Sequence, residues 1–291
     1  MSSRPAFVEP QLPTLVDQPP TGDGWIHEIK HDGYRTMLVL AGRDRKAFTR
    51  NGFDWSDRYQ TFLNAAARLR CRSAILDGEV IVQDARGISD FEALKSVIWS
   101  RPERLVFYAF DLLYLNGKDL REESLLQRRA KLKELVGKDQ SRIQFSDEFA
   151  DGGAALFQAC VEHGLEGIVS KLTSSRYRSG RTNTWLKTKC FTESAFVIIG
   201  TARDRKTGAP LALLARAEEQ RLAYAGSAFI AVSGKEREQL WTRLDAIKLE
   251  RCPIANLRLA DAQWVKPQLV VRVRHLPGAK HLRHGTVKGF C

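Results

Sequence analysis

The 291-residue sequence contains no apolar run near the roughly 20 residues that a membrane-spanning helix needs. Its N-terminus also lacks the apolar stretch of a signal peptide, so we expect the chain to stay in the cytoplasm, with no membrane partner. Its cysteines are few and scattered, without a paired Cys-x-x-Cys spacing, at positions 71, 160, 190, 252 and 291. The pattern therefore argues against a disulfide framework and against a cysteine zinc site.

Two common phosphate-binding loops are absent as well. No segment matches Gly-x-x-x-x-Gly-Lys-Ser/Thr or the dinucleotide-binding Gly-x-Gly-x-x-Gly. Any bound phosphate must then be held by side chains, which argues against kinase and dehydrogenase activities. Acidic residues are in the minority, with 46 Lys+Arg against 34 Asp+Glu and a net charge of +12. Such an excess favours a polyanionic partner such as nucleic acid, although a basic protein without one is the alternative.

The order of apolar runs predicts an α+β fold in two domains, residues 1–190 and 191–291. Residues 1–22 hold five of the ten prolines, which predicts an extended lead-in on the surface. In the first domain, strands are expected at 25–30, 36–41, 73–82, 105–114 and 167–171, and helices at 56–69, 89–98, 124–136 and 152–163. Asp-Gly pairs at 32–33 and 77–78 predict tight turns. The second domain has strand-like pieces at 195–201, 211–216, 221–226 and 264–274 and a helix at 233–247, which suits a small oligonucleotide-binding (OB) barrel.

One strand-like segment ends in a lysine that is followed by a turn and a basic residue: Glu28-Ile29-Lys30-His31-Asp32-Gly33-Tyr34-Arg35. With a period of two, Glu28 and Lys30 point to the same face of that strand. A lysine amine has an ordinary pKa near 10.4, so nucleophilic use requires neighbouring cations or a metal. Taken alone, a strand-end lysine is more often a solvated surface residue.

Further along the chain, several segments supply partners for such a lysine. Glu79 interrupts an apolar strand, where an unpaired charge would cost several kcal/mol, and Glu166 heads another. Phe110 lies where its ring would either stack on a base or pack in the core. Lys187 and Lys189 share one strand face. Two carboxylates that hold magnesium and several convergent cations are what adenylyl transfer to an amine requires.

Taken in order, the motifs resemble those of ATP-dependent DNA ligases in the covalent nucleotidyltransferase superfamily, specifically the ligase domain of bacterial ligase D. The matching series is Lys-x-Asp-Gly-x-Arg from Lys30, Thr-Arg-Asn-Gly from Thr49, Asp-Gly-Glu from Asp77, Phe-Asp-Leu-Leu from Phe110, Glu-Gly-Ile-Val-x-Lys from Glu166 and Trp-x-Lys-x-Lys from Trp185. The resemblance covers the first domain throughout and most of the second. It implies an adenylation domain followed by an OB fold, ATP as substrate, and Mg²⁺ or Mn²⁺ as cofactor.

The resemblance also implies roles for these residues. Lys30 would take AMP from ATP and Asp32 would orient it, while Glu28 would contact the adenine amino group, Phe110 would stack on adenine and Glu79 would contact the ribose. Glu166 and Glu79 would hold the metal. Arg35 and Arg50 would contact phosphate or the nicked strand's 5′ end, and Lys187 and Lys189 would bind the α-phosphate. Lys171 would also belong to the nucleotide-binding site. Lysyl-AMP formation, AMP transfer to a DNA 5′-phosphate and attack by the 3′-hydroxyl would follow.

Between residues 176 and 189, five cations alternate with Tyr177 and Trp185, a pattern expected of a groove that tracks DNA phosphates. A solvated basic loop is the alternative. The DNA-binding residues predicted here and in the basic C-terminal segment are Arg176, Arg178, Arg181, Arg283 and Lys288. The resemblance implies nicked double-stranded DNA as substrate and a Ku-type end-binding protein as partner, and we expect a monomer.

The sequence departs from the family at its last residue, because relatives continue with Arg-x-Asp-Lys where Cys291 stands. In the family this element orients pyrophosphate in the first step, so we expect its absence to affect adenylation from ATP. Two alternative functions follow. One is an RNA ligase or capping-type nucleotidyltransferase, and the other is a nick-binding module impaired in self-adenylation.

Overall fold

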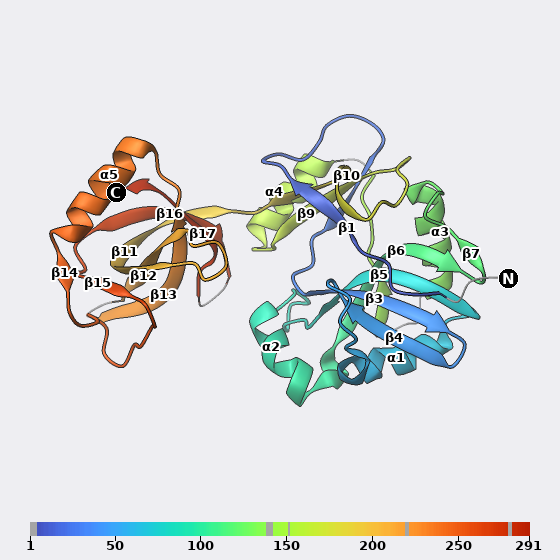
Figure 1. Ribbon diagram of the computed structural model, residues 1–291. Coiled ribbons are helices and arrows are strands. Elements are labelled where there is room, and N and C mark those ends of the chain that lie inside the picture. Colours follow the sequence, from blue (N-terminus) through green and yellow to red (C-terminus); the bar gives the residue numbers. More distant parts are fainter. Residues whose placement is uncertain (1–4, 138–141, 151, 219–220, 279–280) are drawn as a thin grey trace. The chain divides into compact units, whose positions relative to one another are not determined.

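The computed structural model describes residues 5–137, 142–150, 152–218, 221–278 and 281–291 (Figure 1). The chain divides into two compact units, Met1–Cys190 and Phe191–Cys291, at the position where the sequence pattern changes. No helix in the described ranges is long and apolar enough to cross a membrane.

The first unit contains two sheets. A four-stranded sheet has the order β1-β10-β9-β2, and a larger sheet has the order β4-β3-β5-β6-β7 with β8 paired to β6. The strands of the small sheet are β1 (Gln11–Leu15), β2 (Trp25–Ile29), β9 (Gly167–Leu172) and β10 (Gly180–Lys189). Those of the larger sheet are β3 (Tyr34–Ala41), β4 (Asp44–Thr49), β5 (Ser73–Ile81), β6 (Val106–Leu115), β7 (Lys118–Asp119) and β8 (Ile143–Phe145).

Four α-helices accompany these sheets: α1 (Gln60–Ala65), α2 (Phe91–Ser100), α3 (Leu125–Val136) and α4 (Gly153–Glu162). Local capping fixes where two of them begin. The Asp90 side chain accepts a hydrogen bond from the Ala93 amide at the start of α2, and Ser124 and Gln127 form a capping box at the start of α3. The predicted helix over 56–69 is broken instead into two 3₁₀ turns, η1 (Ser56–Tyr59) and η2 (Ala66–Arg68), on either side of α1.

Both faces of the larger sheet are buried, which explains its nearly continuous apolar strands. On one face, Leu38 and Leu76 belong to the main core together with residues of α1, α2 and α3. On the other face, Met37 and Phe110 share a second core with Trp185 of β10. This second core joins the two sheets, and the site lies beside it.

Three sequence predictions for this unit are wrong in detail. The lead-in is not merely a surface segment, because β1 pairs in parallel with β10 and Gln11 is fully buried. Asp77-Gly78 is not a turn but the middle of β5, where a Cβ on Gly78 would stand 2.3 Å from the Phe107 ring. The connection at 32–33 joins β2 of the small sheet to β3 of the larger one, so the hairpin that we expected from its Asp-Gly pair does not form there.

The second unit contains β11 (Thr192–Arg203), β12 (Pro210–Glu218), β13 (Arg221–Ile230), α5 (Gly234–Asp245), β14 (Lys248–Leu249), β15 (Gln263–Val265), β16 (Val270–Leu276) and β17 (Arg283–Phe290). Five strands pair in a closed ring, β11-β12-β13-β17-β16-β11. Leu240 and Leu244 of α5 are buried in the core of this ring. The unit is therefore OB-like, although the strand expected at 264–274 is split into β15 and β16, and β17 was not predicted.

Candidate active site

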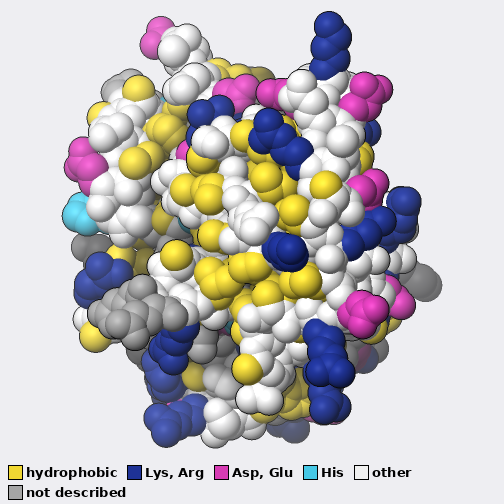
Figure 2. Space-filling view, turned by 90° about the vertical axis from the view of Figure 1, so that its left-hand side faces the viewer, with side chains coloured by type: hydrophobic (Ala, Val, Ile, Leu, Met, Phe, Trp, Pro, Cys, Tyr) yellow, Lys and Arg dark blue, Asp and Glu magenta, His cyan; other side chains and the backbone are white. Residues whose placement is uncertain are grey.

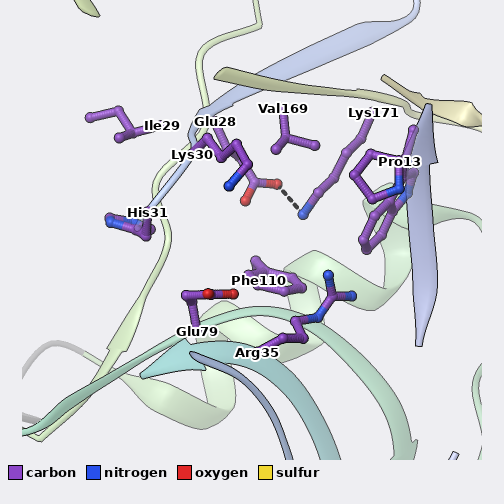
Figure 3. Close-up of a pocket in the computed structure, with 11 residues that line it drawn as sticks. Pro13, Glu28, Ile29, Lys30, His31, Arg35, Glu79, Phe110, Val169 and Lys171 are labelled. Carbon is purple, nitrogen blue, oxygen red and sulfur yellow. Dashed lines mark ion pairs between the residues drawn. The ribbon is translucent and has the colours of Figure 1, made fainter. Parts of the chain in front are cut away.

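A pocket with about 460 Å³ of empty space lies between the two sheets of the first unit (Figure 3). Strands of both sheets contribute to its wall, which is formed by Pro13, Glu28, Ile29, Lys30, His31, Arg35, Glu79, Phe110, Val169, Lys171 and Trp185.

Lys30 follows β2, and its backbone amide donates to the Gly167 carbonyl at 2.9 Å. Its Nζ lies 2.5 Å from Glu166 Oε2, and Lys189 Nζ lies 3.0 Å from Glu166 Oε1. Burial alone would raise the pKa of Glu166, but the charges of Lys30 and Lys189 outweigh it, so the pKa is lowered and the carboxylate stays ionised. This carboxylate therefore connects the predicted nucleophile with one of the predicted phosphate-binding lysines.

Glycine is required next to this carboxylate. Gly167 has φ +145°, and a Cβ there would stand 2.1 Å from the Thr188 carbonyl oxygen. Close approach of β9 and β10 thus depends on Gly167, and it places Glu166 beside Lys189.

The Glu28 carboxylate is buried at the back of the pocket between two cations. Its Oε1 accepts a hydrogen bond from Arg129 Nη1 at 2.9 Å and forms an ion pair with Lys171 Nζ at 2.6 Å. The Lys171 amine lies 4.3 Å from the ring centroids of both Phe110 and Trp185, and burial lowers its pKa to about 8. We did not predict Arg129 as a site residue. The sequence gives one indication of its role, which is its position in a helix that must pack on the sheet.

Glu79 lies across the pocket from Glu28 (Figure 3). Burial raises its pKa to about 7, although Lys30 and Arg35 both act to lower it. Within the described ranges its carboxylate forms no hydrogen bond or ion pair, so it is available to a ligand. The guanidinium carbon of Arg35 lies 4.5 Å from the centroid of the Phe110 ring.

Lys187 is half-buried on β10, and burial lowers its pKa to about 8, with Lys189 and Lys30 contributing in the same direction. His31, next to Lys30, stacks on Tyr108 with ring centroids 4.2 Å apart. Burial lowers the pKa of His31 to about 4, and Lys30 and Lys171 add to the effect, so the imidazole is neutral near pH 7. We did not predict a place for His31 in the pocket wall.

Not every predicted residue lies in the pocket. Asp32 is half-buried in the turn after Lys30, and Arg50 is exposed in the turn after β4; neither belongs to the pocket wall. Glu166, Lys187 and Lys189 are not part of the wall either, although Glu166 contacts the Lys30 amine. Arg283 and Lys288 lie on β17 of the second unit.

Over 176–189 the structure separates the exposed arginines from the two aromatics that alternate with the cations in the sequence. Tyr177 and Trp185 are buried, with 2% and 1% of their surface exposed, because they pack between the sheets. The arginines are exposed, as expected: Arg176 and Arg178 pair with Glu122, and Arg181 lies at the start of β10. The three arginines of this segment are therefore on the surface, whereas the rings belong to the core.

Basic surface is also a feature of the second unit, which has 17 Lys+Arg against 9 Asp+Glu. One face of the molecule shows Lys and Arg side chains spread around an apolar centre, with fewer acidic side chains among them (Figure 2). A polyanion would be attracted to such a surface.

The described residues contain no group of three or more His, Cys, Asp or Glu side chains that could hold a metal by themselves. Mg²⁺ commonly binds through one or two carboxylates together with substrate phosphates. Glu79, whose carboxylate has no partner among the described residues, fits that arrangement, provided that a nucleotide supplies the remaining ligands. The Glu166 carboxylate, predicted as the second metal ligand, has both oxygens on lysines, Oε2 on Lys30 and Oε1 on Lys189.

Comparison with known proteins shows the family of the chain. Residues 14–189 match the ATP dependent DNA ligase domain, and residues 205–290 match the ATP dependent DNA ligase C terminal region. The multifunctional non-homologous end joining protein LigD of Pseudomonas aeruginosa is 36% identical over 295 residues, covering 98% of this chain and 35% of that protein. LigD of Mycobacterium tuberculosis H37Rv is 30% identical over 259 residues, covering 86% of this chain and 34% of that protein. The chain thus spans about a third of the length of these relatives.

Among solved structures, the ligase domain of M. tuberculosis LigD has a TM-score of 0.54 and 26% identity, with 96% of this chain and 95% of that chain covered. The fold is accordingly a nucleotidyltransferase domain followed by an OB-fold domain. The two family matches together cover most of the sequence, and the chain therefore belongs to the family of ATP-dependent DNA ligases.

Proposed function

We propose that the chain seals nicks between 3′-hydroxyl and 5′-phosphate ends of double-stranded DNA through a lysyl-AMP intermediate on Lys30. The observation that carries the proposal is the position of Lys30 in the pocket wall, with its amine on Glu166 and with Lys189 on the same carboxylate. This arrangement supplies a nucleophile, an acceptor for its proton and a cation for phosphate in one place.

In the first step, the Lys30 amine would attack the α-phosphorus of ATP. A phosphorus–nitrogen bond forms, the bond to the β-phosphate oxygen breaks, and pyrophosphate leaves. The ammonium proton must leave before attack, and Glu166 is the acceptor to which Lys30 is already hydrogen bonded. Lys187 and Lys189 would neutralise the charge that grows on the phosphates. A bound Mg²⁺ would add charge neutralisation at the same oxygens.

Lys30 would then pass AMP to the 5′-phosphate at a nick, and the 3′-hydroxyl would displace AMP to close the strand. The exposed arginines, including Arg50 and Arg181, would hold the DNA backbone without reading bases, which suits closure of any nick. Because two relatives are named as non-homologous end joining proteins, we propose repair of DNA breaks as the setting, with a Ku-type end-binding protein as a candidate partner.

Two assays test the proposal. Incubation with Mg²⁺ and ATP labelled on the α-phosphate should add one AMP to the protein, and Lys30→Ala should abolish this. The protein should also seal a nick that is already adenylated. If the wild type neither takes up label nor seals that nick, the proposed activity is wrong. A parallel comparison of AMP transfer to nicked DNA, nicked RNA and capped-end acceptors would distinguish a DNA ligase from an RNA ligase or a capping-type enzyme.

A further inference from the structure

Arg35 is held by a buried chain of polar groups that begins on the opposite sheet. Its Nε donates to Asp77 Oδ1 at 2.6 Å and its Nη2 donates to Asp77 Oδ2 at 2.6 Å. The hydroxyl of Tyr177 donates to the same Oδ2 at 2.7 Å. Asp77 is fully buried and Tyr177 is nearly so.

The direction of each hydrogen bond in this chain is fixed by chemistry. The Gln11 backbone N–H can only donate, and it donates to the Tyr177 oxygen at 2.9 Å. The single proton of Tyr177 is therefore directed to Asp77. Burial raises the pKa of Tyr177 well above its usual value, and the charge of Asp77 adds to this, so the hydroxyl keeps that proton.

The same contacts determine which part of Arg35 is left for a ligand. Nη2 also donates to the Gln11 carbonyl at 3.2 Å, so Nε and both hydrogens of Nη2 are used. The two hydrogens on Nη1 have no partner in the described part of the chain, and Arg35 lies in the pocket wall. A guanidinium fixed on one edge presents its other edge as a preoriented donor for a phosphate oxygen.

We infer that Tyr177 is a positioning residue: through Asp77 it holds Arg35 so that Nη1 meets a phosphate oxyanion in the pocket. This role rests on the proposed function. The N-terminal strand β1 takes part, since Gln11 anchors both Tyr177 and Arg35. The phosphate belongs either to ATP or to the 5′ end of a nick, and the experiment separates these sources.

Tyr177→Phe tests the role because it removes only the hydroxyl and leaves the ring that packs on Trp185. Binding should be measured in Lys30→Ala protein, where no covalent AMP can form. One arm titrates ATP by calorimetry, and the other compares duplexes whose nick carries a 5′-phosphate or a 5′-hydroxyl. The Tyr177 hydroxyl donates to a charged acceptor, the Asp77 carboxylate. Its loss should therefore weaken binding about tenfold, for ATP if Arg35 contacts the nucleotide, or for the 5′-phosphorylated duplex if Arg35 contacts the nick.

A double-mutant cycle shows whether the effect passes through Arg35. With Arg35→Lys, which keeps the charge but loses the two-pronged contact, Tyr177→Phe should weaken binding by less than about twofold. Tyr59→Phe is the matched control, since it removes a fully buried hydroxyl elsewhere in the same unit and should leave binding unchanged. The inference would be overturned if Tyr177→Phe weakened binding equally in the Arg35 and Arg35→Lys proteins, or if it weakened binding of neither ATP nor the nicked duplex. Because these arms need no catalysis, their outcome is independent of whether the wild type seals nicks.

Discussion

Replacing Glu28 with glutamine should destabilise the first unit, because it removes the one negative charge between two buried cations. The side chains of Glu28, Arg129 and Lys171 are only 2–3% exposed, and both cations meet the same carboxylate oxygen. Removing one partner of a buried ion pair costs about 3–5 kcal/mol. Arg129 keeps a second carboxylate, Glu148, so we expect the low end of that range, about 3 kcal/mol.

The measurement is thermal or urea unfolding at pH 7, followed through the transition of the first unit. A loss of about 3 kcal/mol corresponds to a midpoint lower by roughly 6–12 °C for a unit of this size. Glu92→Gln is the matched control, since Glu92 pairs with Lys95 on the surface, where both side chains are more than 40% exposed, and such pairs contribute below about 1 kcal/mol. A Glu28→Gln midpoint within 2 °C or so of the control would refute the reasoning.

Three further predictions concern adenylation, sealing and DNA binding. The rate of lysyl-AMP formation should rise with pH through about 7, as the Glu79 carboxyl ionises, and should fall above about 8, as Lys187 loses its proton. Single-turnover rates between pH 5.5 and 9.5 would check the rise and the fall, and Lys187→Arg should move the fall to higher pH. Arg50→Ala should reduce sealing of a nick about tenfold while changing lysyl-AMP formation less than twofold, because Arg50 is exposed outside the pocket; equal losses in separate assays of the two steps would contradict this. Arg181→Ala should reduce the slope of log affinity for nicked DNA against log salt by about one, measured by salt titration, since it removes one phosphate contact; an unchanged slope would place Arg181 off the DNA.

Local sequence patterns predicted many of the residues that line the pocket, but they did not predict most of the contacts that these residues make. Period-two alternation put Glu28 and Lys30 on one strand face, and a lone carboxylate in an apolar strand identified Glu79; all three lie in the pocket wall. The partners of these residues are remote in sequence. Arg129 is 101 residues from Glu28, so no local pattern pairs them.

The same limit explains the errors. Alternation shows that Tyr177 lies on the face opposite Arg176 and Arg178, but not which face is covered. Which face is covered depends on β1. The prolines of this segment argued against a strand, and its parallel pairing with β10 is a tertiary contact that the local sequence does not show. Asp77-Gly78 has the composition of a turn, yet Gly78 is needed in mid-strand because Phe107 fills the space of a side chain.

If Lys30 carries AMP, mapping the residue to which AMP is attached will identify Lys30. After incubation with Mg²⁺ and α-labelled ATP, the protein is digested at alkaline pH, which preserves a phosphorus–nitrogen bond, and the labelled peptide is sequenced by mass spectrometry. We expect one labelled peptide with AMP on Lys30, and loss of the label when nicked DNA is added. Label on another residue, or sealing of nicked DNA by Lys30→Ala with ATP, would contradict it.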